Sequence, residues 1–273
     1  MSTNRSQHVR WTIWAAFFAL CLLSSNSWLL SAVSADVSSI ARQGCFYGIV
    51  GLLAGAFSYR RLWARVKRDD LAWLQIAAMS ILLFGVPAVV GEWTGYEISD
   101  INRVALFALV PFVVVVVAMG RELEPGIRRF FVPALIGFGG VLLLLPFSFP
   151  ASPRGQIAFG VLLVVVALAG FASEEFYRLL RGFEMLEAVA IVFLANAAFL
   201  IACHFAGATS AEGGSAALWV GWAGLLSIRS LYNLVELLLL VWLLREMPPV
   251  RLAVRYLVVP LFAVLEGFAF LHC

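Results

Sequence analysis

The chain has 273 residues, of which 63% are hydrophobic and 13% are charged, whereas a soluble domain is nearer half apolar and a quarter charged. This composition excludes an ordinary soluble domain and indicates an integral membrane protein. The formal net charge of +3 points to no particular partner, so the distribution of charges along the chain is the more informative property.

Nine apolar runs follow one another along the chain, and each is close to the roughly 20 residues that a membrane-spanning helix needs. Helices are expected because lipid cannot satisfy unpaired backbone groups, and the runs are too long for barrel strands. The sequence therefore predicts an all-α polytopic membrane protein with nine transmembrane helices. The expected spans are 11–34, 41–60, 71–92, 98–119, 130–148, 156–174, 185–206, 217–244 and 250–271.

Basic residues gather in alternate loops between these runs. With the N-terminus in the cytoplasm, 15 of the 19 Lys and Arg residues fall on the cytoplasmic side, as the positive-inside rule requires. We therefore expect a multi-pass protein of the cell membrane with a cytoplasmic N-terminus. An alternative for the first run is a signal peptide that ends in SAVSAD (31–36), whose cleavage leaves eight spans.

Two of the runs resemble each other around a central proline. Pro111 interrupts RVALFALVPFVVVVVAMG (103–120), and Pro260 interrupts LAVRYLVVPLFAVLEGFA (252–269), so the prolines lie 149 residues apart. Matching the fourth span with the ninth gives repeats of five and four spans, over 1–149 and 150–273, with no tenth span in the chain. An odd number of spans per repeat makes the repeat inverted, which is typical of secondary transporters. Both prolines are expected to break their helices.

Four segments resemble elements of one transporter family. They are SSNSW (24–28), INRVALFALVPF (101–112) followed by Glu122, ALIGFGGVLLL (134–144), and the run from Pro248 to Gly267. In these segments the chain resembles the EamA-like branch of the drug/metabolite transporter superfamily. The resemblance implies transport of amino acids, drugs or related solutes. Members of that branch usually have ten helices, so the ninefold count is a departure.

Polar residues inside spans are expensive and mark candidate sites. In SIRSLYNLVELL (227–238), the spacing of Arg229, Asn233 and Glu236 places them on one helical face. Together with Asn26 and Trp28 in the first span, they are the expected substrate-binding residues. The alternative is that these charges only neutralise neighbouring helices.

Three carboxylates are candidates for coupling transport to an ion. Glu174 and Glu175 end the sixth span, and Glu266 follows Pro260 in the ninth. For the Glu pair, a solvated helix end is the competing interpretation. Arg103 and Arg255 lie near span ends, where the long Arg side chain can reach the interface. For Arg103, the alternative is attraction of an anionic substrate at the external mouth.

The sequence contains no Walker motif, GxSxG, HExxH or EF-hand loop, and its four cysteines have no metal-binding spacing. No cofactor, metal or nucleic-acid partner is expected. We expect a non-enzymatic secondary transporter that exports a small organic metabolite by alternating access, in contact with membrane lipid. Whether it forms a homodimer stays open. The alternatives are a non-transporting membrane scaffold and a lipid-modifying enzyme that uses Glu174, Glu175 or Glu236.

Overall fold

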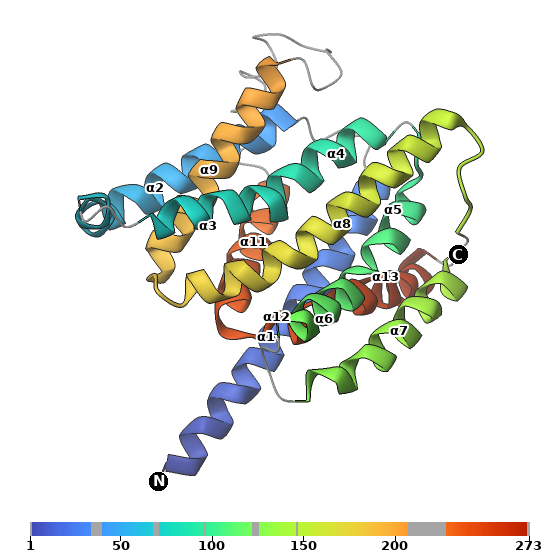
Figure 1. Cartoon of the computed structure of the whole chain (residues 1–273), viewed down its shortest axis with the longest axis horizontal. Helices are drawn as coiled ribbons and strands as arrows, with labels where there is room; N and C mark the ends of the chain where they lie inside the picture. Colours follow the sequence, from blue (N-terminus) through green and yellow to red (C-terminus); the bar gives the residue numbers. More distant parts are fainter. Residues whose placement is uncertain are drawn as a thin grey trace.

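The computed structural model describes residues 2–33, 40–67, 71–95, 97–121, 126–145, 147–206 and 228–271. Within these ranges, the side chains of residues 2–10, 27–33, 66, 228–231, 270 and 271 lie outside the described set. The described residues form helices joined by turns, with no strand among them (Figure 1). The predicted all-α class is confirmed for this part of the chain.

The helices differ widely in length, because several of the expected spans are built from two or three shorter pieces. In chain order they are α1 (Ser2–Val33), α2 (Ile40–Val66), α3 (Ala72–Ser80), η1 (Ile81–Gly85), α4 (Val86–Thr94), α5 (Asp100–Phe107), α6 (Val110–Gly120), η2 (Ile127–Phe130), α7 (Phe131–Leu144), α8 (Pro153–Leu180), α9 (Met185–Phe205), α11 (Ile228–Glu246), α12 (Pro249–Leu252) and α13 (Arg255–Leu271).

Among the described residues, seven stretches are long and apolar enough to cross a membrane, which is the property of a multi-pass membrane protein. Helix α1 contributes a shorter apolar stretch, Trp11–Asn26, and the expected span 217–244 is described only from residue 228, as α11. Nine spans therefore stay a prediction. The seven stretches are Ile40–Arg65, Ala72–Thr94, Asp100–Gly120, Ile127–Leu144, Pro153–Leu180, Met185–Phe205 and Pro249–Ala269.

The stretch Ala72–Thr94 contains one π-helical turn, η1, between α3 and α4. Pro87 follows this turn and has no N–H to donate to the carbonyl of Leu83. A π-turn is one way to accommodate such a missing bond, and π-turns occur frequently at functional sites. The residue at the end of the turn, Gly85, packs so closely on α9 that an added Cβ would lie 2.7 Å from the Phe199 ring.

The stretch Asp100–Gly120 is two helices that meet at residues 108–109. Helix α5 ends at Phe107, and Pro111 is the second residue of α6. Because proline has no N–H, the carbonyl of Phe107 has no donor four residues later. The N–H of Leu109 donates instead to the carbonyl of Leu106 at 3.0 Å, which tightens the chain into a turn.

Pro260 behaves differently, because it lies inside the continuous helix α13. The break in this stretch falls at residues 253–254, between α12 and α13, and not at the proline. A proline removes only one helical hydrogen bond, here the one to the carbonyl of Tyr256, and the helix continues around it. At the break, the N–H of Leu257 donates to the carbonyl of Val254 at 2.9 Å.

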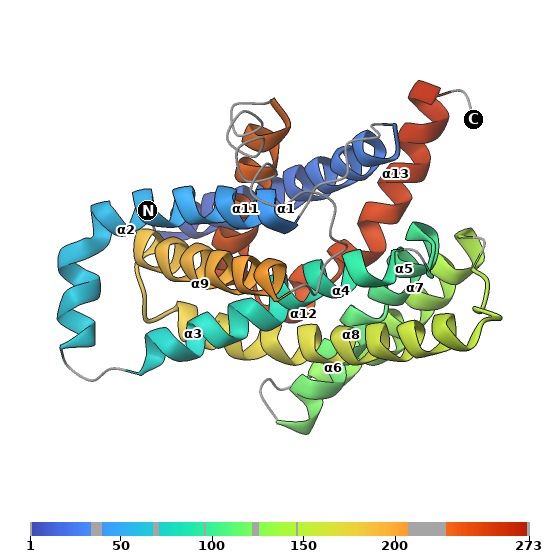
Figure 2. The same ribbon diagram turned by 90° about the horizontal axis from the view of Figure 1, so that it is seen from above.

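The closest helix pair in the fold is α2 with α9, which lie side by side in both views (Figures 1 and 2). Four glycines of α2 face α9, and each would bring an added Cβ to within 4.0 Å of α9 atoms. Small residues let two helix backbones approach in lipid, where packing replaces the hydrophobic effect as the source of association. The four are Gly44, Gly48, Gly51 and Gly55.

The pair α2–α9 lies against α3, η1, α4 and α11, and the other helices pack beyond these. Helix α1 lies against α11 and α13, while α8 lies against α3, α4 and α6. One face of α8 is buried along the length of the helix, from Gly155 to Leu180. This arrangement leaves α4, α5, α11 and α13 to meet near the middle of the molecule.

We expect Gly51→Ala to destabilise the protein by about 1–3 kcal/mol, the usual cost of overpacking. An added Cβ there would lie 2.8 Å from the backbone nitrogen of Leu194, which cannot move aside cheaply. Gly160→Ala is the matched control, because an added Cβ at Gly160 meets nothing within 4 Å. Thermal unfolding in detergent measures both variants. Equal melting temperatures would contradict the close α2–α9 packing.

Reporter fusions after residues 64, 123, 180 and 247 test the predicted orientation. All four positions lie in loops or helix ends that the basic residues assign to the cytoplasm. We expect cytoplasmic activity from each fusion, and a periplasmic signal at any one of them would overturn the predicted topology.

Candidate functional site

A cavity of about 490 Å³ lies where α1, α4, α5, α11 and α13 meet. Its wall is mostly apolar and includes Phe107, Leu240 and Pro260. A few polar groups in an apolar wall are typical of sites that bind small organic molecules. The polar lining residues are Ser24, Asp100, Arg103, Glu236, Arg255 and Tyr256.

One side of the cavity is formed by the polar segment of α1. The Ser24 hydroxyl donates to Glu236 Oε1 of α11 at 2.6 Å, so the carboxylate is held against the wall. One residue later, the Ser25 hydroxyl lies 3.0 Å from Glu266 Oε1 of α13. The other oxygen of Glu266 is buried and has no hydrogen-bond partner among the described residues. Consecutive serines thus connect α1 to a carboxylate on each of two helices.

Arg103 extends from α5 into the same cavity. One Nη donates to the carbonyl of Gly91 in α4 at 2.7 Å, and the other pairs with Asp100 one turn earlier. The Arg103 Nε is buried without a hydrogen-bond partner among the described residues. The Asp100 side chain is 67% exposed, so the cavity reaches the molecular surface at the start of α5.

Arg255 enters the cavity as the first residue of α13, directly after the break at residues 253–254. Its Nη2 donates to the Tyr256 hydroxyl at 2.8 Å, and its guanidinium lies 4.6 Å from the centre of the Tyr256 ring. The Tyr256 ring in turn stacks on Phe107 of α5, with centroids 6.0 Å apart and planes 19° apart. The two interrupted spans therefore meet through their aromatic residues.

The expected substrate-binding residues divide into three groups. Glu236 lies in the cavity wall. Asn26 is exposed beside the hydroxyl of Tyr232, and Asn233 is half-buried outside the lining. Trp28 and Arg229 belong to α1 and α11, and their side chains lie outside the described residues.

The expected coupling and helix-break residues also separate. Pro260 lines the cavity, whereas Glu266, six residues later on α13, is outside the lining and contacts Ser25. Pro111 is buried in α6, away from the lining. Glu174 is buried near the end of α8, and Glu175 pairs with Arg121 beyond the end of α6. Neither glutamate of α8 lines the cavity.

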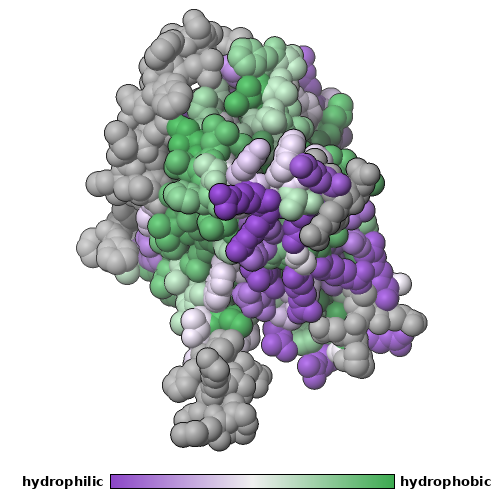
Figure 3. Space-filling view, turned by 90° about the vertical axis from the view of Figure 1, so that its left-hand side faces the viewer, coloured by the Kyte–Doolittle hydropathy of each residue, from purple (hydrophilic) through white to green (hydrophobic). Residues whose placement is uncertain are grey.

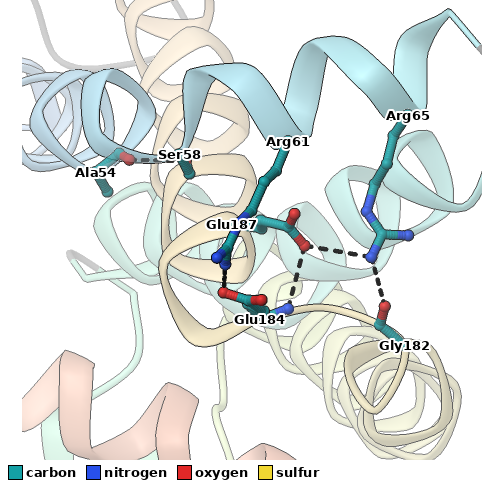
Figure 4. Close-up of polar contacts among 7 residues, drawn as sticks. All are labelled: Ala54, Ser58, Arg61, Arg65, Gly182, Glu184 and Glu187. Carbon is teal, nitrogen blue, oxygen red and sulfur yellow. Dashed lines mark hydrogen bonds and ion pairs between the residues drawn. The ribbon is translucent and has the colours of Figure 1, made fainter.

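A network of ion pairs lies at the far end of the helices from Asp100 (Figure 4). Arg65 of α2 donates to the carbonyl of Gly182 at 2.7 Å and lies 3.3 Å from Glu187 of α9, whose side chain is 4% exposed. Arg61 pairs with Glu184, and Glu187 also caps α9 by accepting from the Glu184 N–H at 3.1 Å. The same face carries a patch of hydrophilic residues beside apolar surface (Figure 3).

Sequence reasoning assigned Arg103 and Arg255 to span ends and did not select Ser24, Phe107 or Tyr256 as site residues. The helix breaks bring both arginines into the cavity. The available signal was a charged residue within eight positions before a proline in an apolar run, which occurs in both repeats. This signal alone does not show that the arginines face the cavity, because their direction depends on where each helix breaks.

Glu187→Gln keeps an oxygen that can cap α9 and removes only the charge that faces Arg65. Removal of one partner from a buried pair costs about 3 kcal/mol or more, so we expect a clear fall in melting temperature. Glu246→Gln is the control, because Glu246 pairs at 3.6 Å with Arg245 while 40% exposed, and such a change costs within about 0.5 kcal/mol. Equal stability of the two variants would show that the network does not hold α2 to α9.

No family model matches the chain, and no curated protein or solved structure matches it either.

Proposed function

We propose that this protein is a secondary transporter that moves a small organic metabolite across the cell membrane, with export the expected direction. The observation that supports it most is the cavity of about 490 Å³, which is lined by residues from both halves of the chain. A central site between two related halves is the arrangement that alternating access uses.

The correspondence follows from the sequence offset of the two prolines. Three pairs of cavity residues lie 149 residues apart, the same spacing as Pro111 and Pro260. The pairs are Pro87 with Glu236, Gly91 with Leu240, and Phe107 with Tyr256.

Two contacts in the structure join a residue to its own counterpart, meaning the residue 149 positions later in the chain. Phe107 stacks on Tyr256, and an added Cβ on Gly48 would lie 3.7 Å from the Cβ of Ala197, which is also 149 residues later. In a two-fold arrangement, only residues on the axis touch their counterparts. These contacts favour an inverted repeat of 1–149 and 150–273 with an axis through both points.

Helix packing is consistent with the same two-fold relation, in which each helix of the first half corresponds to the helix about 149 residues later. The packing of α1 on α13 corresponds to that of α8 on α6, and the packing of α1 on α11 corresponds to that of α8 on α3 and α4. The pair α2–α9 corresponds to itself. This is the pattern expected of an EamA-like arrangement, which we include in the proposal.

Three ion pairs join the first half of the chain to the second, away from the cavity lining. They are Arg61–Glu184, Arg65–Glu187 and Arg121–Glu175. In the proposed mechanism, with the predicted orientation, these pairs hold the cytoplasmic end closed while the cavity opens outward near Asp100. Alternating access then requires these pairs to separate.

The rival functions predict other arrangements. A lipid-modifying enzyme needs its carboxylates together at one interface, whereas Glu236 lies in the cavity and Glu174 and Glu175 lie near the end of α8. A scaffold needs no accessible cavity, and only a flux measurement separates it from a transporter.

A solute screen in inside-out vesicles, with and without a pH gradient, tests the proposal. We expect uptake of at least one small metabolite by the wild type and its loss in Glu236→Gln at unchanged abundance, because Glu236 lines the cavity and contacts α1. The control Glu246→Gln lies on the same helix, exposed and outside the lining. Normal flux in Glu236→Gln at normal abundance would remove Glu236 from the site. Absence of flux for every solute tested would favour a scaffold.

A further inference from the structure

The two arginines of the cavity are short of acceptors, and this suggests what the cavity binds. Arg255 donates to the Tyr256 hydroxyl and lies within electrostatic range of Glu236, with no direct ion pair among the described residues. Arg103 has one nitrogen, Nε, that is buried without an acceptor in the described part of the chain. A guanidinium has five N–H donors, and leaving them unmade inside a membrane protein is costly.

The two carboxylates that line the cavity each have a donor among the described residues. Glu236 accepts the Ser24 hydroxyl at 2.6 Å, and Asp100 pairs with Arg103 while 67% exposed to the surroundings. Among the lining residues, the buried atom without a partner in the described part of the chain is a donor, Arg103 Nε, whereas the unpartnered acceptor Glu266 Oε2 belongs to a residue outside the lining. An incoming group that brings acceptor oxygens matches this need.

We propose that the cavity binds an organic oxyanion, whose carboxylate or phosphate oxygens accept hydrogen bonds from Arg255 and Arg103. Planar guanidinium groups match such oxyanions with two parallel hydrogen bonds. The body of the ligand lies along the apolar wall, where the stacked rings of Phe107 and Tyr256 provide a flat surface. The inference rests on the proposed transport function, because it names the class of solute for the same cavity.

Arg255 is the principal anion-binding residue in this arrangement. Arg255 is the first residue after the helix break, and its side chain lines the cavity there. Contact with Tyr256 fixes the guanidinium in place before a ligand arrives. A preoriented group loses less side-chain freedom on binding, which favours affinity. Arg103, held by Gly91 and Asp100, acts as the second donor.

Probes with one body and different head groups test the proposal without any need for transport. The purified protein in nanodiscs is titrated with 3-phenylpropionate, 3-phenylpropyl phosphate, 3-phenylpropylamine and 3-phenylpropanol, and binding is followed by calorimetry. We expect at least one of the two oxyanions to bind about tenfold more tightly than the alcohol, and the tighter oxyanion identifies the preferred head group. Tighter binding of the amine than of both oxyanions, or equal binding of all four probes, would overturn the proposal.

Variants then assign the effect to the arginines. Arg255→Gln should bring the affinity for the oxyanion down about tenfold, to that of the alcohol, while Arg255→Lys should retain part of the preference. Unchanged binding of 3-phenylpropanol shows that the variant cavity is intact. Arg154→Gln removes an exposed arginine at the start of α8, outside the lining, and should leave all four affinities unchanged. An oxyanion preference that survives in Arg255→Gln would also overturn the assignment.

The binding and flux measurements can refute the anion site and the transport function independently. Oxyanion binding without flux of any solute would refute transport and leave the anion site standing. Flux of solutes that carry no oxyanion, together with equal binding of the four probes, would refute the anion site and leave transport standing.

Discussion

A helix that stops inside a membrane leaves backbone groups that hydrocarbon cannot satisfy, and this constraint determines where the cavity lies. Non-helical backbone at membrane depth is tolerated only where it is buried in protein or lines a cavity. Both breaks, at residues 108–109 and 253–254, obey this rule. Phe107 precedes the first and Arg255 follows the second, and both line the cavity. Moving either break would change which side chains the cavity contains.

The close pair α2–α9 is a rigid part of the bundle, and the broken helices pack instead on α1, α7 and α8. Four glycines let these two backbones approach, so the pair has little room for side-chain rearrangement. Helix α8 is buried against α3, α4 and α6, and α1 lies against α11 and α13. The polar residues of α1 then meet Glu236 and Glu266 at distances set by packing elsewhere. The site is thus a consequence of the whole bundle.

Hydropathy predicted most of the helical stretches, because burial in lipid demands long apolar runs. It predicted an interior position for Glu236, because a charge within a span is costly in lipid, and Glu236 lines the cavity. It placed the second break at Pro260, because the chain gives no sign that residues 253–254 turn instead. The position of Arg255 in the cavity wall was not predicted for the same reason. Its place near the end of a span suggested that its side chain reaches the membrane interface, whereas the turn at 253–254 directs it into the cavity.

Contacts between a residue and its own counterpart have a consequence for motion. When the two halves of an inverted repeat exchange conformations, a contact away from the two-fold axis is replaced by its symmetry-related contact. A contact on the axis is its own symmetry-related contact and is kept. Under the proposed exchange, Gly48 with Ala197 and Phe107 with Tyr256 keep their neighbours in both states. In the proposed mechanism, the line through these two contacts is the pivot, and the cavity residue Tyr256 lies on it. A solute that touches Tyr256 would then rest against a part that stays still while the two ends of the molecule alternate between open and closed.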